Sequence, residues 1–285
     1  MKYKGRARGR PPPTTFHGAT GMPLSRLAIE HSIATITFNR DDKRNAFNHA
    51  MSRQTLSHFD AAERERCRVI ILRSNPGAKV WCSGHDLTDL KPGEDPYNSD
   101  NPMIELFSRI QEVPMPVMTM VEGSVYAGGL LLNMVADIAI ASVTTEVTMT
   151  ANRIGVPFIP EIYAYWLKVT GLHKTKELFF TAAPISARDA YAAGIFNHVV
   201  EAGDLERTTL EMAGQILRCS AEAVANSKYQ LNLLAACTDL SEEELKEIER
   251  GRQKILKSPE TQKGLACLIQ RLRGNETPQG GSSTG

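Results

Sequence analysis

The composition of this 285-residue chain is that of a globular protein, with 42% hydrophobic residues and a formal net charge of +1. It has no run of the roughly eighteen apolar residues that a membrane span needs, which excludes an integral membrane protein. No apolar segment of the secretory type follows the basic start, so we expect a cytoplasmic protein without membrane contact.

Basic charge is concentrated at the amino-terminal end. Residues 1–29 carry six basic and no acidic side chains, which leaves 27 basic and 32 acidic side chains for the rest. With three consecutive prolines and several glycines, residues 1–24 are predicted to be a disordered basic tail. We favour an extension from cloning or from a start assigned upstream of Met22. An RNA-binding arm and an organelle-targeting segment are the alternatives, and we expect no nucleic-acid partner.

The first elements predicted are a hairpin, a helix and a buried strand. Alternating apolar residues predict a hairpin over 27–38, with its turn near His31 and Ser32. A helix over 49–66 follows. Residues 67–72 form a continuous β-branched run, which is typical of a strand covered on both faces.

Strands and helices then alternate up to about residue 200. A long polar loop over 91–102 has the length of a lid, and a helix over 103–112 follows it. Further strands are predicted at residues 117–121, 137–141, 147–149 and 197–200. The helix after residue 129 is apolar on several faces and should therefore be central.

The chain after residue 202 is predicted to be helical. Residues 241–244 (Ser-Glu-Glu-Glu) have the form of a capping box, and apolar residues follow on one side of that helix. Such a stripe indicates an oligomer contact or a cover over the core. Residues 274–285 are expected to be an unstructured tail.

The cysteines point to neither a disulfide framework nor a zinc site, because they are scattered and never in CxxC spacing. No metal is expected. We interpret Cys82 as a small packed residue rather than a nucleophile. The cysteines are Cys67, Cys82, Cys219, Cys237 and Cys267.

Two glycine-rich turns carry the strongest functional signal. Residues 82–86 (Cys-Ser-Gly-His-Asp) and 122–129 (Glu-Gly-Ser-Val-Tyr-Ala-Gly-Gly) each follow a strand-like run and lead into a helix-like run. Such turns can aim unpaired backbone amides at one point, where they stabilise an anion that develops during reaction. The alternative interpretation is a pair of ordinary strand-to-helix turns.

Four segments in order resemble the signatures of the crotonase (enoyl-CoA hydratase/isomerase) superfamily, over about residues 27–273. They are residues 38–47, 81–86, 121–129 and 155–157. The resemblance implies an α/β fold in which residues 25–202 form a spiral of strand-strand-helix turns. It also implies that residues 203–273 form a helical region used to assemble a trimer or a dimer of trimers.

The resemblance implies an acyl-CoA substrate, with no cofactor apart from the coenzyme A of that substrate. Its thioester oxygen would lie between the backbone N–H groups of His85 and Gly128. The His85 imidazole is the alternative general base, although the turn requires only its N–H. Arg271 would come from the same or a neighbouring subunit. The residues implied to bind CoA are Lys43, Arg44, Ala46, Ser83, Asp86, Leu87 and Arg271.

Departures from the family pattern argue against hydration. The hydratases carry two glutamates where this chain has Leu131 and either Ala151 or Asn152. Without two carboxylates, hydration has no positioned acid and base. Glu161 and Glu146 are the candidate substitutes, although Glu161 after Pro160 could equally start a helix.

Within the superfamily, residues 83–86, 120–125, 176–185 and 197–200 are most similar to the methylmalonyl-CoA decarboxylases. That likeness implies decarboxylation of methylmalonyl-CoA, or a related malonyl-type thioester, to propionyl-CoA, with Thr150 positioning the carboxylate. The decarboxylases carry a tyrosine where this chain has Phe158, and Tyr163 or Tyr126 could supply the missing hydroxyl. The predicted substrate pocket contains Leu131, Phe158, Tyr126 and Glu161.

Two other functions are left open. One is hydration or isomerisation of an enoyl-CoA with a non-standard acid and base. The other is a non-catalytic role, either in binding acyl-CoA or as an RNA-associated homologue that uses the basic tail.

Overall fold

The computed structural model describes residues 22–89, 95–98, 100–236 and 241–274. The predictions about the two tails, part of the polar loop and Cys237 therefore lie outside the described residues.

The chain begins with the predicted hairpin. Strands β1 (Ser25–Glu30) and β2 (Ile33–Phe38) pair antiparallel. His31 and Ser32 connect them with φ angles of 49° and 65°, the left-handed conformation that tight hairpin turns require. Helix α1 (His49–Arg64) follows, and the Asn48 side chain caps it by accepting a hydrogen bond from the Met51 amide at 2.8 Å.

The next three repeats have the predicted strand-strand-helix order. They comprise β3 (Val69–Ser74), β4 (Val80–Cys82) and α2 (Pro102–Glu112); β5 (Val117–Val121), β6 (Ser124–Tyr126) and α3 (Ala127–Val135); and β7 (Ile138–Ser142), β8 (Glu146–Thr148) and α4 (Pro160–Thr181). Strand β9 (Ile185–Ser186), helix α5 (Ala187–Ala192) and strand β10 (His198–Val200) complete the spiral.

Each of these three repeats contributes its first strand to one sheet and its second strand to another, whereas β1 and β2 both lie in the first sheet. Among the described residues, the large sheet has the order β1-β2-β3-β5-β7-β10 and the small sheet the order β4-β6-β8-β9. The pairs between consecutive repeats are parallel. This arrangement confirms the predicted spiral and brings the ends of β4, β6 and β8 to one edge of the small sheet.

Helix α3 lies at the centre of the molecule. All of its residues from Gly128 to Val135 are buried, which its apolar composition on every face requires. Strand β3 is likewise almost wholly buried, as its β-branched run predicted.

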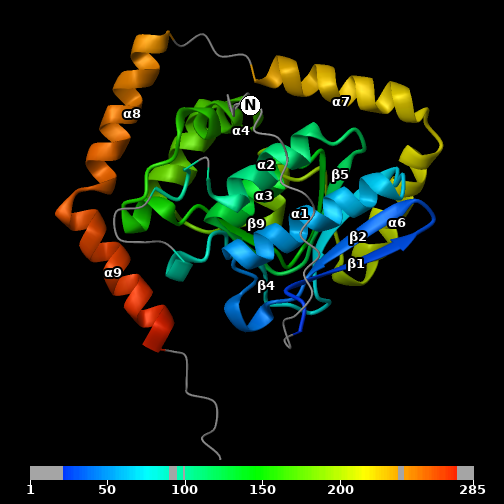
Figure 1. Ribbon diagram of the computed structural model, residues 1–285, viewed down its shortest axis with the longest axis horizontal. Helices are drawn as coiled ribbons and strands as arrows, with labels where there is room; N and C mark the ends of the chain where they lie inside the picture. The colour runs from blue at the N-terminus through cyan, green and yellow to red at the C-terminus, as the bar shows by residue number, and fades with distance from the viewer. Residues whose placement is uncertain (1–21, 90–94, 99, 237–240, 275–285) are drawn as a thin grey trace, which may run out of the picture.

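The carboxyl-terminal part is helical, as predicted, and consists of α6 (Leu205–Leu217), α7 (Ala221–Ala235), α8 (Glu242–Leu256) and α9 (Pro259–Gly274). Figure 1 shows α7 across the top of the molecule and α8 and α9 down its left side. Helix α9 contacts the spiral through Thr261, whose hydroxyl donates to the Gly155 carbonyl at 3.2 Å. None of the described helices is long and apolar enough to cross a membrane.

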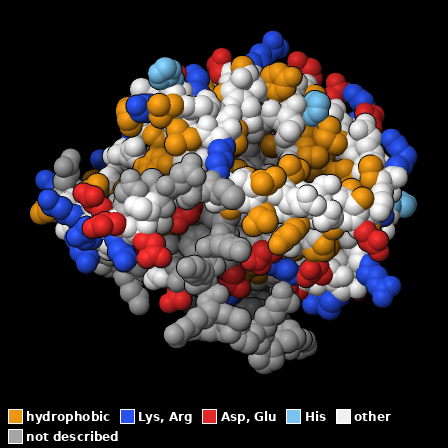
Figure 2. All heavy atoms as spheres, turned by 90° about the horizontal axis from the view of Figure 1, so that it is seen from above, with side chains coloured by type: hydrophobic (Ala, Val, Ile, Leu, Met, Phe, Trp, Pro, Cys, Tyr) orange, Lys and Arg blue, Asp and Glu red, His pale blue; other side chains and the backbone are white. Residues whose placement is uncertain are grey.

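Large apolar side chains remain exposed on α4 and α7. Phe180 is 76% exposed, and Tyr229 and Leu234 are 66% and 68% exposed. Figure 2, which views the molecule from above, shows hydrophobic side chains gathered in patches on this face. Exposed apolar surface of this kind is typical of a contact with another chain.

Candidate active site

Three predicted catalytic residues follow neighbouring parallel strands of the small sheet. His85 comes after β4, Gly128 after β6 and Thr150 after β8. Strands β4 and β6 pair through Cys82 and Val125, and β6 and β8 pair through Tyr126 and Thr148. Because the strands run parallel, all three residues lie at the same edge of the sheet.

The two glycine turns pack backbone against backbone at that edge. A Cβ atom added to Gly84 would lie 2.6 Å from the Gly128 amide nitrogen, and one added to Gly128 would lie 3.2 Å from the His85 amide nitrogen. A Cβ atom added to Gly129 would lie 2.4 Å from the Cys82 carbonyl oxygen. The glycines are therefore required by the close approach of the two turns.

The Gly128 amide lies in the first turn of α3, where N–H groups have no acceptor within the helix. The N-cap residue, Tyr126, provides no side-chain cap, and the helix dipole favours negative charge here. Ala127 has a φ of 40°, a left-handed conformation that favours glycine. Ala127 is thus held in a strained conformation beside the site.

The His85 side chain is a poor general base. Burial lowers its pKa to about 4, although the charge of Asp95 acts in the opposite direction, so the imidazole is neutral at neutral pH. Its Nε2 atom is buried and makes no hydrogen bond within the described part of the chain. Its ring contacts Phe107 and Tyr97, with centroid distances of 6.4 Å and 5.8 Å. These properties favour the backbone N–H as the functional group of this residue.

Aromatic side chains form an apolar wall next to His85. Phe158 is buried, with its ring centroid 5.2 Å from those of Tyr97 and Phe179 and 6.0 Å from that of Tyr163. The sequence pattern did not single out Tyr97, although an aromatic residue in an otherwise polar loop was an available signal. Tyr97 is the ring that connects Phe158 to His85.

The predicted pocket residue Tyr126 lies on the short strand β6. Along β6, Ser124 and Tyr126 alternate with the buried Val125 and face away from the core. Tyr126 instead lines a separate cavity of about 740 Å³ together with Arg44 and Lys79.

The two candidate substitute carboxylates, Glu161 and Glu146, are both exposed. Glu161 lies in the first turn of α4 after Pro160, where a negative charge stabilises the helix start. Its place in the substrate pocket therefore stays a prediction. Asn152 is one of the two residues that could stand where the hydratases have their second glutamate. Its side chain donates to the Phe179 carbonyl at 2.7 Å and has a structural role. The hydration alternative thus lacks a positioned acid or base among these residues.

The predicted CoA-binding segments are held together by backbone hydrogen bonds. The Ser83 amide donates to the Arg44 carbonyl at 3.1 Å, and the Phe47 amide donates to the Gly84 carbonyl at 2.7 Å. The Asp86 amide donates back to the Phe47 carbonyl at 2.9 Å. Residues 43–47 and 83–87 consequently form one surface beside the two glycine turns.

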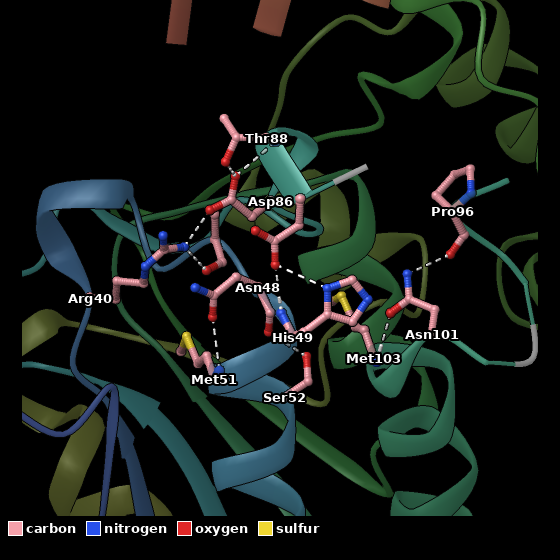
Figure 3. A network of polar contacts seen from close by, with 12 residues as sticks. Arg40, Asn48, His49, Met51, Ser52, Asp86, Thr88, Pro96, Asn101 and Met103 are labelled. Carbon is pink, nitrogen blue, oxygen red and sulfur yellow. Dashed lines mark hydrogen bonds and ion pairs between the residues drawn. The ribbon is translucent and has the colours of Figure 1, made fainter. Parts of the chain in front are cut away.

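The Asp86 carboxylate holds this surface together. Figure 3 shows it between Arg40 and Thr88, which donate to it at 2.6 Å and 2.7 Å. Burial opposes its ionisation, but the hydrogen bonds from Thr88 and Arg40 outweigh burial and lower its pKa. Arg40 also donates to the Ala46 carbonyl at 2.7 Å. Sequence reasoning missed Arg40, which positions both segments.

Arg271 is exposed on α9, which packs against the short turn Leu87–Asp89 of its own chain. Arg273 on the same helix donates to the Thr88 carbonyl at 3.2 Å. Helix α9 therefore contacts a predicted CoA-binding segment of its own chain through Arg273. Among the described residues, no group of three or more His, Cys, Asp or Glu side chains could hold a metal ion.

A comparison with family models adds to this geometry. Residues 28–273 match the model described as enoyl-CoA hydratase/isomerase. The chain belongs to this family.

One curated protein and two solved structures are 33–35% identical to this chain. The chain is 35% identical to methylmalonyl-CoA decarboxylase of Escherichia coli (strain K12) over 246 residues, which cover 86% of this chain and 94% of that protein. A methylmalonyl-CoA decarboxylase structure in complex with 2-nitronate-propionyl-CoA matches at a TM-score of 0.84 and 34% identity, covering 87% of this chain and 96% of that chain. A methylmalonyl-CoA decarboxylase structure in complex with 2S-carboxypropyl CoA matches at a TM-score of 0.84 and 33% identity, covering 88% of this chain and 97% of that chain.

The fold is shared more widely. A carnitinyl-CoA hydratase from Mycobacterium avium matches at a TM-score of 0.72 and 23% identity, covering 88% of this chain and 97% of that chain. At that identity the likeness supports the fold alone.

Proposed function

We propose that this family member decarboxylates methylmalonyl-CoA, or a closely related malonyl-type thioester, to give propionyl-CoA and CO₂. The observation that carries the proposal is the close contact between the two glycine turns, where a Cβ atom added to Gly128 would lie 3.2 Å from the His85 amide nitrogen. The similarity to methylmalonyl-CoA decarboxylase supports the choice of substrate.

The reaction needs a place for negative charge more than it needs an acid or a base. The thioester oxygen would accept hydrogen bonds from the His85 and Gly128 amides. When the bond to the carboxylate carbon breaks, its electron pair forms an enolate, whose charge rests on that oxygen. One such donor contributes roughly 10²–10³ in rate in other enzymes. A proton then adds to the enolate carbon and gives propionyl-CoA.

The surroundings fit this chemistry. Leu131 and Phe158 are both buried, and an apolar wall disfavours the charge of the carboxylate that is lost. Thr150 at the end of β8 would position the carboxylate through its hydroxyl. Lys43 and Arg44 would meet the phosphates of CoA with their positive charges, and Arg271 on α9 would add a third charge from the same or a neighbouring subunit.

Turnover of methylmalonyl-CoA by the purified protein tests the proposal. The expected result is propionyl-CoA and CO₂ in equal amounts, detected by chromatography, with no hydration of crotonyl-CoA at the same enzyme concentration. Crotonyl-CoA hydration without decarboxylation would overturn the proposal and restore the hydratase alternative.

A further inference from the structure

A small apolar cavity lies between α2, α3 and α4. It has a volume of about 20 Å³ and a wall of apolar side-chain surface. The residues that line it include Phe107 from α2, Leu131, Met134 and Val135 from α3, and Ile162 and Trp166 from α4.

Two of these lining residues adjoin the paired amides. Leu131 lies three residues after Gly128 on α3, so both are on the same face of that helix, one turn apart. The ring of Phe107 lies against the His85 ring, with a centroid distance of 6.4 Å. The cavity therefore begins beside the two residues whose amides would hold the thioester oxygen.

Met134 and Val135 line the cavity about one helical turn beyond Leu131. Both side chains are buried in the main hydrophobic cluster, as is Trp166 behind them. A close-packed interior of this kind resists expansion, so even one added methylene group destabilises it.

We propose that this cavity receives the alkyl branch on the carbon next to the thioester and limits that branch to one methyl group. The inference rests on the proposed function and specifies its substrate. A cavity of about 20 Å³ holds roughly one group of the size of water or methyl. An ethyl branch would have to displace Met134 or Val135, and a carboxylate would lose its hydration against an apolar wall.

Three thioesters that differ only in the branch test the size limit: malonyl-CoA, methylmalonyl-CoA and ethylmalonyl-CoA. The wild-type protein should favour methylmalonyl-CoA in kcat/KM by roughly tenfold or more over ethylmalonyl-CoA, which is the usual effect of one methylene group in an apolar pocket. A kcat/KM for ethylmalonyl-CoA equal to that for methylmalonyl-CoA would overturn the proposal.

Two variants change the cavity in opposite directions. Met134→Ala enlarges its far end and should raise the ratio of ethylmalonyl-CoA to methylmalonyl-CoA turnover by about tenfold. Val135→Ile fills it and should lower methylmalonyl-CoA turnover relative to malonyl-CoA by about tenfold. Met120→Ala is the matched control, because Met120 is equally buried but belongs to a second hydrophobic cluster. Its ratios should match those of the wild type.

Thermal unfolding shows which variants fold. Val135→Ile adds a single methylene group to an existing cavity, so it tests the proposal even where Met134→Ala does not fold. Unchanged substrate ratios in folded Val135→Ile would overturn the proposal.

A binding measurement separates this inference from the proposed function. Acetyl-, propionyl- and butyryl-CoA carry the same series of branches without a carboxylate, and calorimetry gives their affinities without turnover. Tighter binding of propionyl-CoA than of butyryl-CoA, reversed in Met134→Ala, would support the cavity even if no thioester is decarboxylated. Equal affinities would overturn it even if decarboxylation is found.

Discussion

At the scale of single residues, the contact between Gly128 and His85 decides whether the site can work. A methyl group on Gly128 would lie 2.9 Å from His85 Nδ1 and 3.2 Å from the His85 amide nitrogen. Gly128→Ala should therefore fill the space between the two amides and lower kcat/KM by roughly 10²–10³, the value of one oxyanion donor. Steady-state kinetics with methylmalonyl-CoA measures the loss.

The control for this variant is Gly214→Ala. A Cβ atom at Gly214 on α6 meets nothing within 4 Å, and alanine is a better helix former than glycine. This control should retain wild-type activity. Equal activity of Gly128→Ala and Gly214→Ala would contradict the assigned role of the Gly128 amide.

Replacement of His85 separates its backbone from its side chain. His85→Gln keeps the amide N–H and removes the imidazole, so activity should fall by less than about tenfold. Loss of a true general base would cost roughly 10²–10⁴. A fall of that size, in a variant shown by circular dichroism to be folded, would identify the imidazole as catalytic.

The buried His85 also makes stability depend on pH. Its pKa is lowered to about 4, so between pH 6.5 and 4 the unfolded chain binds more protons than the folded chain. The contribution of the neutral, buried His85 to the stability of the fold is complete above pH 6.5 and is lost as the pH falls through the interval. From pH 7 to 5, urea unfolding should show the wild type losing about 2 kcal/mol more than His85→Gln. His58, whose pKa burial also lowers, is present in both proteins.

The residues of the site were predictable to different degrees. The glycine turns could be found because the close approach of two backbone segments requires glycine, which can be read in the sequence. The aromatic contact of Tyr97 with both His85 and Phe158 could not be found, because it joins segments that only the folded chain brings together. The face of β6 that Tyr126 occupies could not be predicted, because a strand of only three residues is too short for alternation to be recognised.

At the scale of elements, α7 is fixed to the spiral by a buried lysine. Lys228 Nζ donates to the Ile110 and Met115 carbonyls at 2.7 Å and 3.1 Å and to the Asp137 carboxylate at 2.7 Å. Lys228→Met would leave Asp137 largely buried without its cation. We expect the free energy of unfolding, measured in urea, to fall by about 3–5 kcal/mol.

An exposed ion pair provides the matched control. Lys174 pairs with Glu177 at 2.7 Å on the surface of α4, and Lys174→Met should cost less than about 1 kcal/mol. The double variant Lys228→Met/Asp137→Asn should recover part of the lost stability, because no buried charge remains unpaired. Equal effects of the two single variants would contradict the structural role of Lys228.

Most elements were predictable, and the exceptions have a common cause. The strands of the large sheet and α1 to α3 follow from long apolar patterns. Strand β9 has only two residues, and α4 contains a kink at Gly171, where φ is 70° and ψ is 169°. Such short or interrupted elements are set by tertiary contacts rather than by local periodicity.

At the scale of the whole molecule, the exposed apolar side chains on α4 and α7 are expected to be covered by other copies of the chain. The resemblance to the crotonase superfamily implies a trimer or a dimer of trimers, and we predict this assembly in solution. Leu234→Glu, which places a charge on the exposed face of α7, should reduce the mass measured by sedimentation equilibrium toward that of one chain. A monomeric wild type would contradict this prediction.

The central claim, that two backbone amides hold the enolate oxygen, is tested most directly by a crystal structure of the protein with 2-nitronate-propionyl-CoA. The planar nitronate anion of this analogue resembles the enolate. We predict that its thioester oxygen lies about 2.7–3.1 Å from the amide nitrogens of both His85 and Gly128. A thioester oxygen that contacts neither amide, or one held by a side chain instead, would contradict the account.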